Sequence, residues 1–270
     1  MSRIAQTFAR LQQQERKALI PYLVAGDPDP AATVPAMHAL VEAGADIIEL
    51  GVPFSDPMAE GPVIQVAHER ALEHGVSLRD VLSMIKRFRQ SDNETPIVLM
   101  GYANPVEAMG YELFAEQASG AGVDGVLTVD LPPEEGVETS ALMASHGIDS
   151  ILLLAPTTAE DRVKTICEQA RGYLYYVSLK GVTGAGNLDV QSVSDKMAII
   201  RRYSTLPVAV GFGIKDAATA SAVAPLCDGV VVGSALVDCL IAKFDPVHPA
   251  QMPVAATELI SAIRSAIDTV

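Results

Sequence analysis

Two carboxylic acids carry the clearest chemical content of this chain. Glu49 lies near the carboxyl end of an almost wholly apolar run, residues 46–50, and Glu60 lies in the loop beyond it. Such a run is typical of a parallel strand that is covered on both faces, so we expect the Glu49 carboxyl to be buried. Burial penalises the charged form and raises the pKa of a carboxyl toward the range useful for proton transfer. The alternative is a strand-end glutamate that reaches water or an ion pair.

The elements that position these acids follow a repeated pattern, in which a helix ends at Gly and an Asp or Gly opens an apolar run. It occurs at residues 44–48, 122–127 and 147–152, with a variant at 228–231. Gly after a helix adopts the left-handed cap conformation without a steric penalty. The comparable apolar runs predict eight strands, near residues 18–24, 46–50, 96–100, 125–129, 149–154, 173–177, 207–210 and 229–232.

Helical patterns alternate with these strands, which places the chain in the α/β class. Eight βα units are what a (β/α)8 TIM barrel requires, although a doubly wound open sheet shows the same alternation. The strand count and the 270 residues favour the barrel, and no linker divides residues 1–270, so we expect one domain. Ile4, Phe8 and Leu11 form the stripe of an extra N-terminal helix. The other helices are expected at residues 33–43, 78–88, 112–119, 134–145, 159–170, 193–202, 216–224 and 253–269.

Composition narrows the classes of partner. A net charge of −14 argues against nucleic acid and anionic membranes, which require clustered Lys and Arg. The longest apolar runs are far too short to cross a bilayer, and the N-terminus does not resemble a signal peptide. We therefore expect a cytoplasmic protein that captures a small anionic substrate locally.

The sequence also predicts no metal site. The three cysteines, Cys167, Cys227 and Cys239, are widely spaced and read as reduced core thiols. The five histidines likewise lack ligand spacing.

Two glycine turns follow the last two predicted strands, at residues 211–214 and 233–235. In this fold the loops after strands seven and eight commonly bind phosphate through backbone N–H groups and a helix N-terminus. We expect Gly213, Gly233 and Ser234 to enclose a phosphate and Phe212 to contact the substrate. A purely structural role remains the alternative for either turn, because tight βα turns need Gly anyway.

The loop after strand six, residues 178–187, has three glycines and few apolar anchors. It is predicted to close over the barrel mouth, with Thr183 bonding a carboxylate and Gly184 reaching the phosphate. A flexible connection without this role is the alternative.

Several tyrosines are predicted to line an aromatic pocket. Tyr173 and Tyr175 share one face of strand six, while Tyr22 and Tyr102 lie at or beyond the ends of strands one and three. Taken singly, each tyrosine is better explained as an ordinary core residue. Together their rings and hydroxyls suit an aromatic substrate.

Residues 49–61 match the pattern Glu-[aliphatic]-Gly-x-Pro-Phe-Ser-Asp-Pro-x-Ala-[acid]-Gly, and in this respect the chain resembles the tryptophan synthase alpha chain family. The resemblance covers essentially the whole chain. Further segments recur in the order and spacing of that family, at residues 21–28, 102–105, 171–175, 181–184, 211–214 and 233–235.

The resemblance implies a lyase that cleaves indole-3-glycerol phosphate to indole and glyceraldehyde 3-phosphate. Glu49 would shuttle protons, and Glu60 would hold the indole N–H and stabilise positive charge on the ring. The indole would pass to a beta chain that holds pyridoxal phosphate, in an α2β2 complex, with no cofactor in this chain. The docking face implied for the beta chain bears Pro53, Asp56, Asn104 and Pro132.

One position departs from the family, because Glu60 stands where Asp is usual. The charge is kept and the carboxylate moves about one methylene outward, which keeps open a second hypothesis: a mainly regulatory subunit with weak lyase activity that activates its beta partner. A third reading, a phosphate-sugar epimerase or isomerase barrel, would require metal-binding histidines at strand ends, and none are there.

Overall fold

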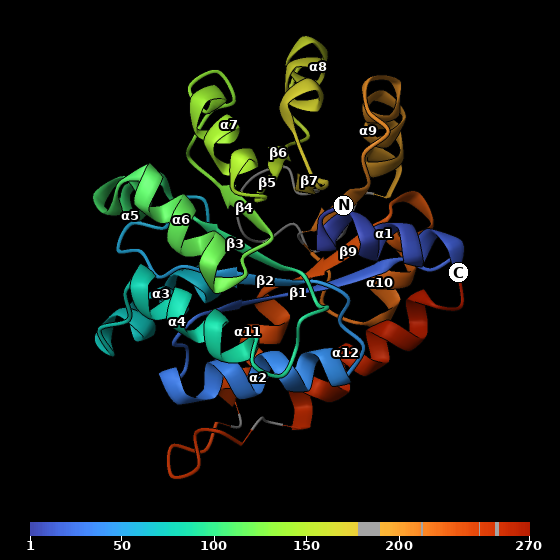
Figure 1. Cartoon of the computed structure of the whole chain (residues 1–270). Helices are drawn as coiled ribbons and strands as arrows, with labels where there is room; N and C mark the ends of the chain where they lie inside the picture. The colour runs from blue at the N-terminus through green and yellow to red at the C-terminus, as the bar shows by residue number, and fades with distance from the viewer. Residues whose placement is uncertain (178–189, 212, 243, 252–253) are drawn as a thin grey trace.

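The computed structural model describes residues 1–177, 190–211, 213–242, 244–251 and 254–270. The described residues form a central sheet of parallel strands surrounded by helices (Figure 1). Three residues of the predicted site, Thr183, Gly184 and Phe212, lie outside the described part of the chain.

The sheet closes on itself. Its strands run in the order β5-β4-β3-β2-β1-β9-β8-β7-β6, and β5 and β6 are consecutive pieces of one predicted strand. Ile151 separates them, and its amide donates to the Val126 carbonyl at 2.9 Å, so the ring continues. The expected eight-stranded barrel is confirmed. The strands are β1 Ala18–Val24, β2 Ile48–Gly51, β3 Ile97–Gly101, β4 Gly125–Thr128, β5 Asp149–Ser150, β6 Leu152–Leu154, β7 Leu174–Val177, β8 Val208–Gly211 and β9 Gly229–Val232.

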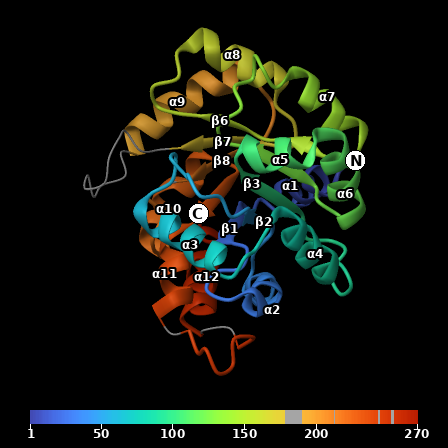
Figure 2. The same cartoon turned by 90° about the vertical axis from the view of Figure 1, so that its left-hand side faces the viewer.

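The helices cover the outside of the barrel, and Figure 2 shows α7, α8 and α9 along one side with α2, α3, α11 and α12 along another. The sequence patterns did not single out α3, which begins at Pro62 directly after the acid-bearing loop, or α5, whose first turn contains Pro105. The helices are α1 Arg3–Gln13, α2 Pro30–Glu42, α3 Pro62–Glu73, α4 Leu78–Phe88, α5 Ala103–Met109, α6 Tyr111–Ala121, α7 Val137–Ser145, α8 Glu160–Gln169, α9 Val190–Tyr203, α10 Ala217–Val223, the short 3-10 turn η1 Ala224–Leu226, α11 Ser234–Ala242 and α12 Val254–Ile267.

The predicted N-terminal helix, α1, covers the end of the barrel where the strands begin. Its apolar stripe of Ile4, Phe8 and Leu11 is buried in one cluster with the barrel interior. The Phe8 ring lies 5.8 Å from that of Tyr173, and a Cβ added to Gly125 would come within 3.0 Å of Ile4. Because side chains of α1 fill the barrel interior at this end, the interior is open only toward the carboxyl ends of the strands, where sites lie in this fold.

The repeated Gly-x-Asp pattern has a structural cause. Asp46 and Asp124 each precede a strand, and their carboxylates accept the backbone N–H of Leu19 and Ile97, at the starts of the neighbouring strands, at 3.0 and 2.8 Å. Each carboxylate also receives a guanidinium, from Arg264 or Arg89. Asp228 repeats the arrangement with Val208 and Arg201. These three carboxylates therefore join adjacent strands at the amino end of the barrel, whereas Asp149, in the remaining copy of the pattern, accepts the Ser2 hydroxyl at 2.7 Å.

Among the described helices, none is both long enough and apolar enough to span a membrane.

Candidate active site

Glu49 lies on β2 inside the barrel, with 0% of its surface exposed. The Tyr173 hydroxyl donates to its Oε1 at 2.6 Å, while Oε2 has no hydrogen-bond partner among the described residues. Burial raises the pKa of Glu49 to about 8, against the lowering effect of the Tyr173 hydrogen bond. The alternative in which this carboxyl reaches water is wrong. A buried acid that keeps its proton near neutral pH, with one oxygen unpaired, is suited to proton transfer.

Glu60 lies half-buried in the loop that follows β2. Its position is set by backbone contacts on both sides, since the amide of Ala59 donates to the Tyr102 hydroxyl at 3.1 Å and Gln65 donates to the Glu60 carbonyl at 2.9 Å. The ring of Phe54, earlier in the same loop, stacks on Tyr102 with centroids 5.1 Å apart. Burial raises the pKa of Glu60 to about 7.

The tyrosines predicted to bind substrate converge on these two acids. Burial raises the pKa of Tyr22 and Tyr175 well above the usual value, and the charges of both Glu49 and Glu60 add to the shift. The pKa of Tyr102 rises to about 12 for the same reason, with Glu60 contributing. The geometry agrees, because Tyr22 pairs with Glu49 across β1 and β2, Tyr102 binds the amide of the residue before Glu60, and Tyr175 lines the same cavity as Glu60. The structure therefore brings the acid pair and the three tyrosines to one region.

A cavity of about 380 Å³ opens beside Glu60 and Tyr175, within the size range of small-molecule sites. Its walls come from the ends of the middle strands and the loops beyond them, and they are mostly apolar. They include Met100, Thr128 and Leu153. An apolar space with a carboxylate at its edge can hold a mostly apolar ligand that carries a polar group.

Two glycines allow the tyrosine hydroxyls to lie where they do. A Cβ at Gly51 would be 2.4 Å from the Tyr22 hydroxyl oxygen, and one at Gly211 would be 2.2 Å from that of Tyr175. Any side chain at either position would displace the ring. The sequence alone did not indicate this role, because the contacts join residues far apart in the chain.

The described parts of the predicted phosphate turns lie at the carboxyl ends of β8 and β9. Gly213 has a φ of +80°, a conformation that favours glycine. Gly233 directly precedes α11, and the exposed Ser234 begins that helix, so the amides at its start lack partners within the helix. A Cβ on Gly233 would lie 3.8 Å from Tyr22, which places this turn next to the tyrosine group.

The four residues expected to dock a beta chain follow β2, β3 and β4, on the rim that surrounds the site. Asp56 and Asn104 are exposed, Pro132 is half-buried and Pro53 is buried. Met58, in the acid-bearing loop, is 80% exposed and adds an apolar side chain to this rim. Pro53 is placed to shape the loop rather than to offer surface.

Two functional contacts were not anticipated from the sequence. Tyr173 was grouped with the pocket residues, yet its hydroxyl binds Glu49 deep in the barrel. His68 on α3 was considered only as a metal ligand, but it contacts both Tyr22 and the acid-bearing loop. In the described part of the chain, no group of three or more His, Cys, Asp or Glu side chains is arranged to hold a metal ion.

A closed (β/α)8 barrel with one buried acid, one half-buried acid and a group of tyrosines near the carboxyl ends of its strands has the features of a TIM-barrel enzyme. Comparison with known proteins then identifies the family. Residues 8–262 match the family model described as tryptophan synthase alpha chain. The chain belongs to the tryptophan synthase alpha chain family, as the sequence motifs predicted.

Individual relatives agree over the full length. The tryptophan synthase alpha chain of Thioalkalivibrio sulfidiphilus is 60% identical over 268 residues, which cover 99% of this chain and 100% of that one. The same protein of Marinobacter nauticus is 58% identical over 269 residues, with 100% and 99% covered.

Solved structures give the same result for the fold. The crystal structure of tryptophan synthase subunit alpha from Legionella pneumophila superposes with a TM-score of 0.91 at 47% identity and covers 100% of both chains. A structure of Mycobacterium tuberculosis tryptophan synthase matches with a TM-score of 0.89 at 37% identity, covering 99% of this chain and 98% of that one.

Proposed function

We propose that this protein cleaves indole-3-glycerol phosphate to indole and glyceraldehyde 3-phosphate. The observation that carries the proposal is Glu49, a fully buried acid with a pKa of about 8 and an unpaired oxygen, close to a second acid with a pKa of about 7. The cleavage is a retro-aldol reaction that needs one proton delivered and one removed, and a single carboxyl can do both.

The steps balance in protons and electrons. Glu49 gives its proton to C3 of the indole ring, which becomes a cation. The ionised Glu49 then removes the proton from the hydroxyl on the adjacent glycerol carbon. That oxygen becomes the carbonyl oxygen of the aldehyde as the bond between its carbon and C3 of the ring breaks. The electron pair of the broken bond returns the ring to neutral indole. Glu49 ends with a proton, ready for the next turnover.

Glu60 has the complementary role in this proposal. Its carboxylate accepts the indole N–H at the edge of the apolar cavity, and it stabilises the positive charge that appears on the ring only after C3 is protonated. An interaction that is stronger in the transition state than in the bound substrate lowers the barrier.

The phosphate of the substrate is proposed to lie at the turns after β8 and β9. Inorganic phosphate should therefore shift the amide signals of Gly213, Gly233 and Ser234 in nuclear magnetic resonance spectra, because these N–H groups would donate to the anion. Gly184 is included in the same prediction, although it lies outside the described residues. Gly44 and Gly147, at the opposite end of the barrel, serve as controls that should not move. If none of the four site amides responds, the phosphate does not bind there.

We further propose a beta chain as partner, with pyridoxal phosphate held by that chain and none by this one, in an α2β2 complex in the cytoplasm. The exposed Asp56 and Asn104 lie on the rim around the acid pair. An interface on this rim would let indole pass between the chains without entering solvent.

Replacing Asp56 by Lys should weaken association with a beta chain at least tenfold, since it reverses a charge on the proposed docking face, and should leave the melting temperature nearly unchanged. Titration calorimetry measures the affinity. Glu94→Lys is the matched control, because Glu94 is an equally charged, exposed residue just before β3 at the far end of the barrel. Equal affinities for both variants would place the interface elsewhere.

Glu60 also motivates the second candidate, a mainly regulatory subunit with weak lyase activity. An indole-release assay with and without a beta chain separates the two. The catalytic proposal predicts equal amounts of indole and glyceraldehyde 3-phosphate from the isolated chain and faster release in the complex. Negligible indole in both conditions, together with a stimulated beta reaction, would favour the regulatory subunit.

A further inference from the structure

One buried histidine connects the acid-bearing loop to the substrate pocket, and the mechanism above does not use it. His68 lies on α3 with 1% of its surface exposed. Its Nδ1 accepts the backbone N–H of Phe54 at 3.1 Å, and its Nε2 lies 3.4 Å from the hydroxyl oxygen of Tyr22. The imidazole therefore contacts both the loop that carries Glu60 and the strand that carries Tyr22.

The direction of these hydrogen bonds follows from the donors. A backbone N–H can only donate, so Nδ1 of His68 must carry a lone pair. Burial lowers the pKa of His68 to about 4, so the ring is neutral near pH 7. A neutral imidazole with an unprotonated Nδ1 has its proton on Nε2. Nε2–H therefore donates to the oxygen of Tyr22.

This leaves the Tyr22 proton available for another acceptor. The hydroxyl oxygen already accepts from His68, so the O–H bond points away from the histidine. The oxygen lies against Gly51, two residues beyond Glu49 and on the same face of β2. Glu49 and Glu60 are the carboxyl groups that raise the pKa of Tyr22, and Oε2 of Glu49 lacks a partner among the described residues. The O–H is thus presented to the space beside the acid pair.

Tyr22 also contacts the proposed phosphate side of the site, because its ring lies next to Gly233. If the phosphate of the substrate lies at that turn and its indole ring lies beside Glu60, the three-carbon chain between them lies beside Tyr22. The oxygen on that chain that loses its proton to Glu49 is the acceptor that Tyr22 could reach.

We propose that His68 is a positioning residue of the lyase reaction, which holds the acid-bearing loop through the Phe54 amide and directs the Tyr22 hydroxyl as a donor to the reacting glycerol oxygen. This inference rests on the proposed function. The donated hydrogen bond stabilises negative charge on the oxygen while its proton moves to Glu49. Phenylalanine at position 22 would fill the same space without this bond.

A double-mutant cycle tests the connection between the two residues. Tyr22→Phe removes only the hydroxyl. His68→Asn retains an oxygen near the place of Nδ1, which can still accept from Phe54, but its NH2 group lies short of the place of Nε2 and cannot donate to Tyr22. Each variant should lower kcat about tenfold, the loss of roughly one hydrogen bond, with KM changed less than about twofold. The double variant should be no slower than the slower single variant, because both changes remove the same interaction.

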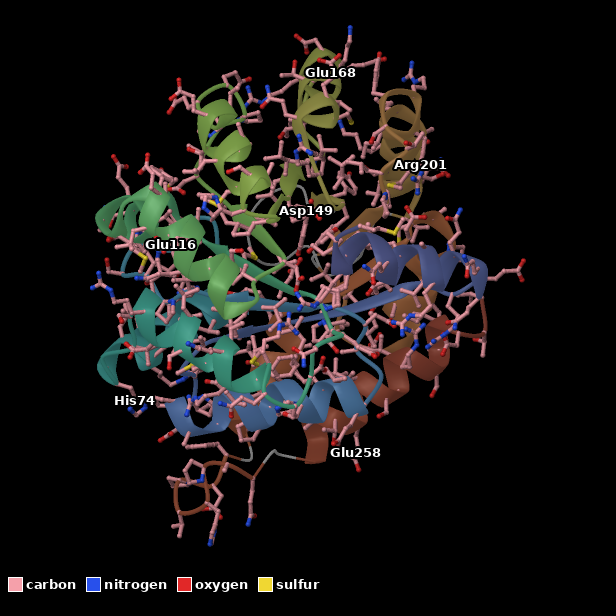
Figure 3. All side chains as sticks on the ribbon, viewed as in Figure 1. His74, Glu116, Asp149, Glu168, Arg201 and Glu258 are labelled. Carbon is pink, nitrogen blue, oxygen red and sulfur yellow. The ribbon has the colours of Figure 1, made fainter. Side chains whose placement is uncertain are left out.

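His74→Asn is the matched control. His74 follows α3 directly, its Nε2 contacts the Pro28 carbonyl at 3.1 Å, and Figure 3 shows it at the periphery of the molecule. It should retain the kcat of the unmodified protein. If the losses from His68→Asn and Tyr22→Phe multiply in the double variant, or if His68→Asn leaves kcat unchanged, His68 does not act through Tyr22 and the inference is wrong.

A second measurement is independent of turnover and of how the variants fold. Nitrogen-15 spectra of the histidine rings in the unmodified protein should show His68 protonated at Nε2 only, without change between about pH 6 and pH 8. Protonation at Nδ1 in that range would overturn the inference. Should the unmodified protein release no indole, the proposed function fails, whereas the spectra still decide the orientation of His68.

Discussion

Replacement of Glu49 by Gln should reduce the rate of indole release on the order of a thousandfold or more, within the range that general acid–base groups contribute. The amide has nearly the same shape, and its oxygen can still accept the Tyr173 hydroxyl, which now binds Oε1 at 2.6 Å. It cannot carry a proton to the indole ring or from the glycerol hydroxyl. The fold and phosphate binding should therefore persist while turnover is lost.

Single-turnover kinetics on the isolated chain measure this loss. Glu116→Gln provides the matched control, because it makes the same change of carboxylate to amide at an exposed residue on α6, away from the barrel interior (Figure 3). The control should retain the rate of the unmodified protein. If Glu49→Gln keeps activity within about tenfold, Glu49 is not the group that moves the protons.

Glu60→Gln should lower the rate about a hundredfold to a thousandfold, the usual cost of losing one preorganised electrostatic contact in a transition state. A neutral amide can still accept the indole N–H, but it does not offset the positive charge on the protonated ring. Because that charge is absent from the bound substrate, the loss should fall on kcat rather than on KM.

Glu60→Asp separates the effect of charge from that of length. The shorter acid should remain active or become faster, since it restores the residue usual in the family. The chain contains no Trp, so the emission of indole is not masked and stopped-flow fluorescence can compare the three proteins. A slow unmodified protein that Glu60→Asp makes fast would support the regulatory candidate. Equal rates for the unmodified protein and Glu60→Gln would exclude a catalytic role at this position.

Much of the fold could be predicted because each strand of a closed parallel barrel is buried on both faces. Such strands appear as short apolar runs, and the Gly-x-Asp junctions before them recur because carboxylates such as those of Asp46 and Asp124 join neighbouring strands. The N-terminal helix could be predicted equally well from Ile4, Phe8 and Leu11. A helix that covers an apolar surface has apolar residues spaced at the helical period.

Other features depend on distances that no local pattern encodes. The break at Ile151 splits one predicted strand into β5 and β6, although Ile151 itself is as apolar as the residues of the other strands. Helix α3 was obscured because its exposed positions include the apolar Val66 and Leu72 while the polar His68 is buried, and with the helix the contacts of His68 were missed.

The sequence was sufficient to predict which residues lie at the site, but not which residues they contact. The acid pair and the tyrosines were predicted from their places at strand ends, and the structure brings them together. The bond from Tyr173 to Glu49 joins residues 124 positions apart, so only the closed barrel reveals it. The substrate-binding roles of Thr183, Gly184 and Phe212 stay predictions, because these residues lie outside the described part of the chain.

The dependence of kcat/KM on pH tests the central claim, that Glu49 acts as the proton donor while Glu60 is ionised. Burial raises the pKa of Glu60 to about 7 and that of Glu49 to about 8. Activity should rise with pH as Glu60 loses its proton, reach a maximum between about 7 and 8, and fall as Glu49 loses its own. The two limbs of the pH profile report apparent pKa values that belong to the pair of acids, because the acids influence each other. In Glu60→Gln the rising limb should disappear while the falling limb remains. A rate of indole release that does not change between about pH 6 and pH 9 in the unmodified protein would contradict the account.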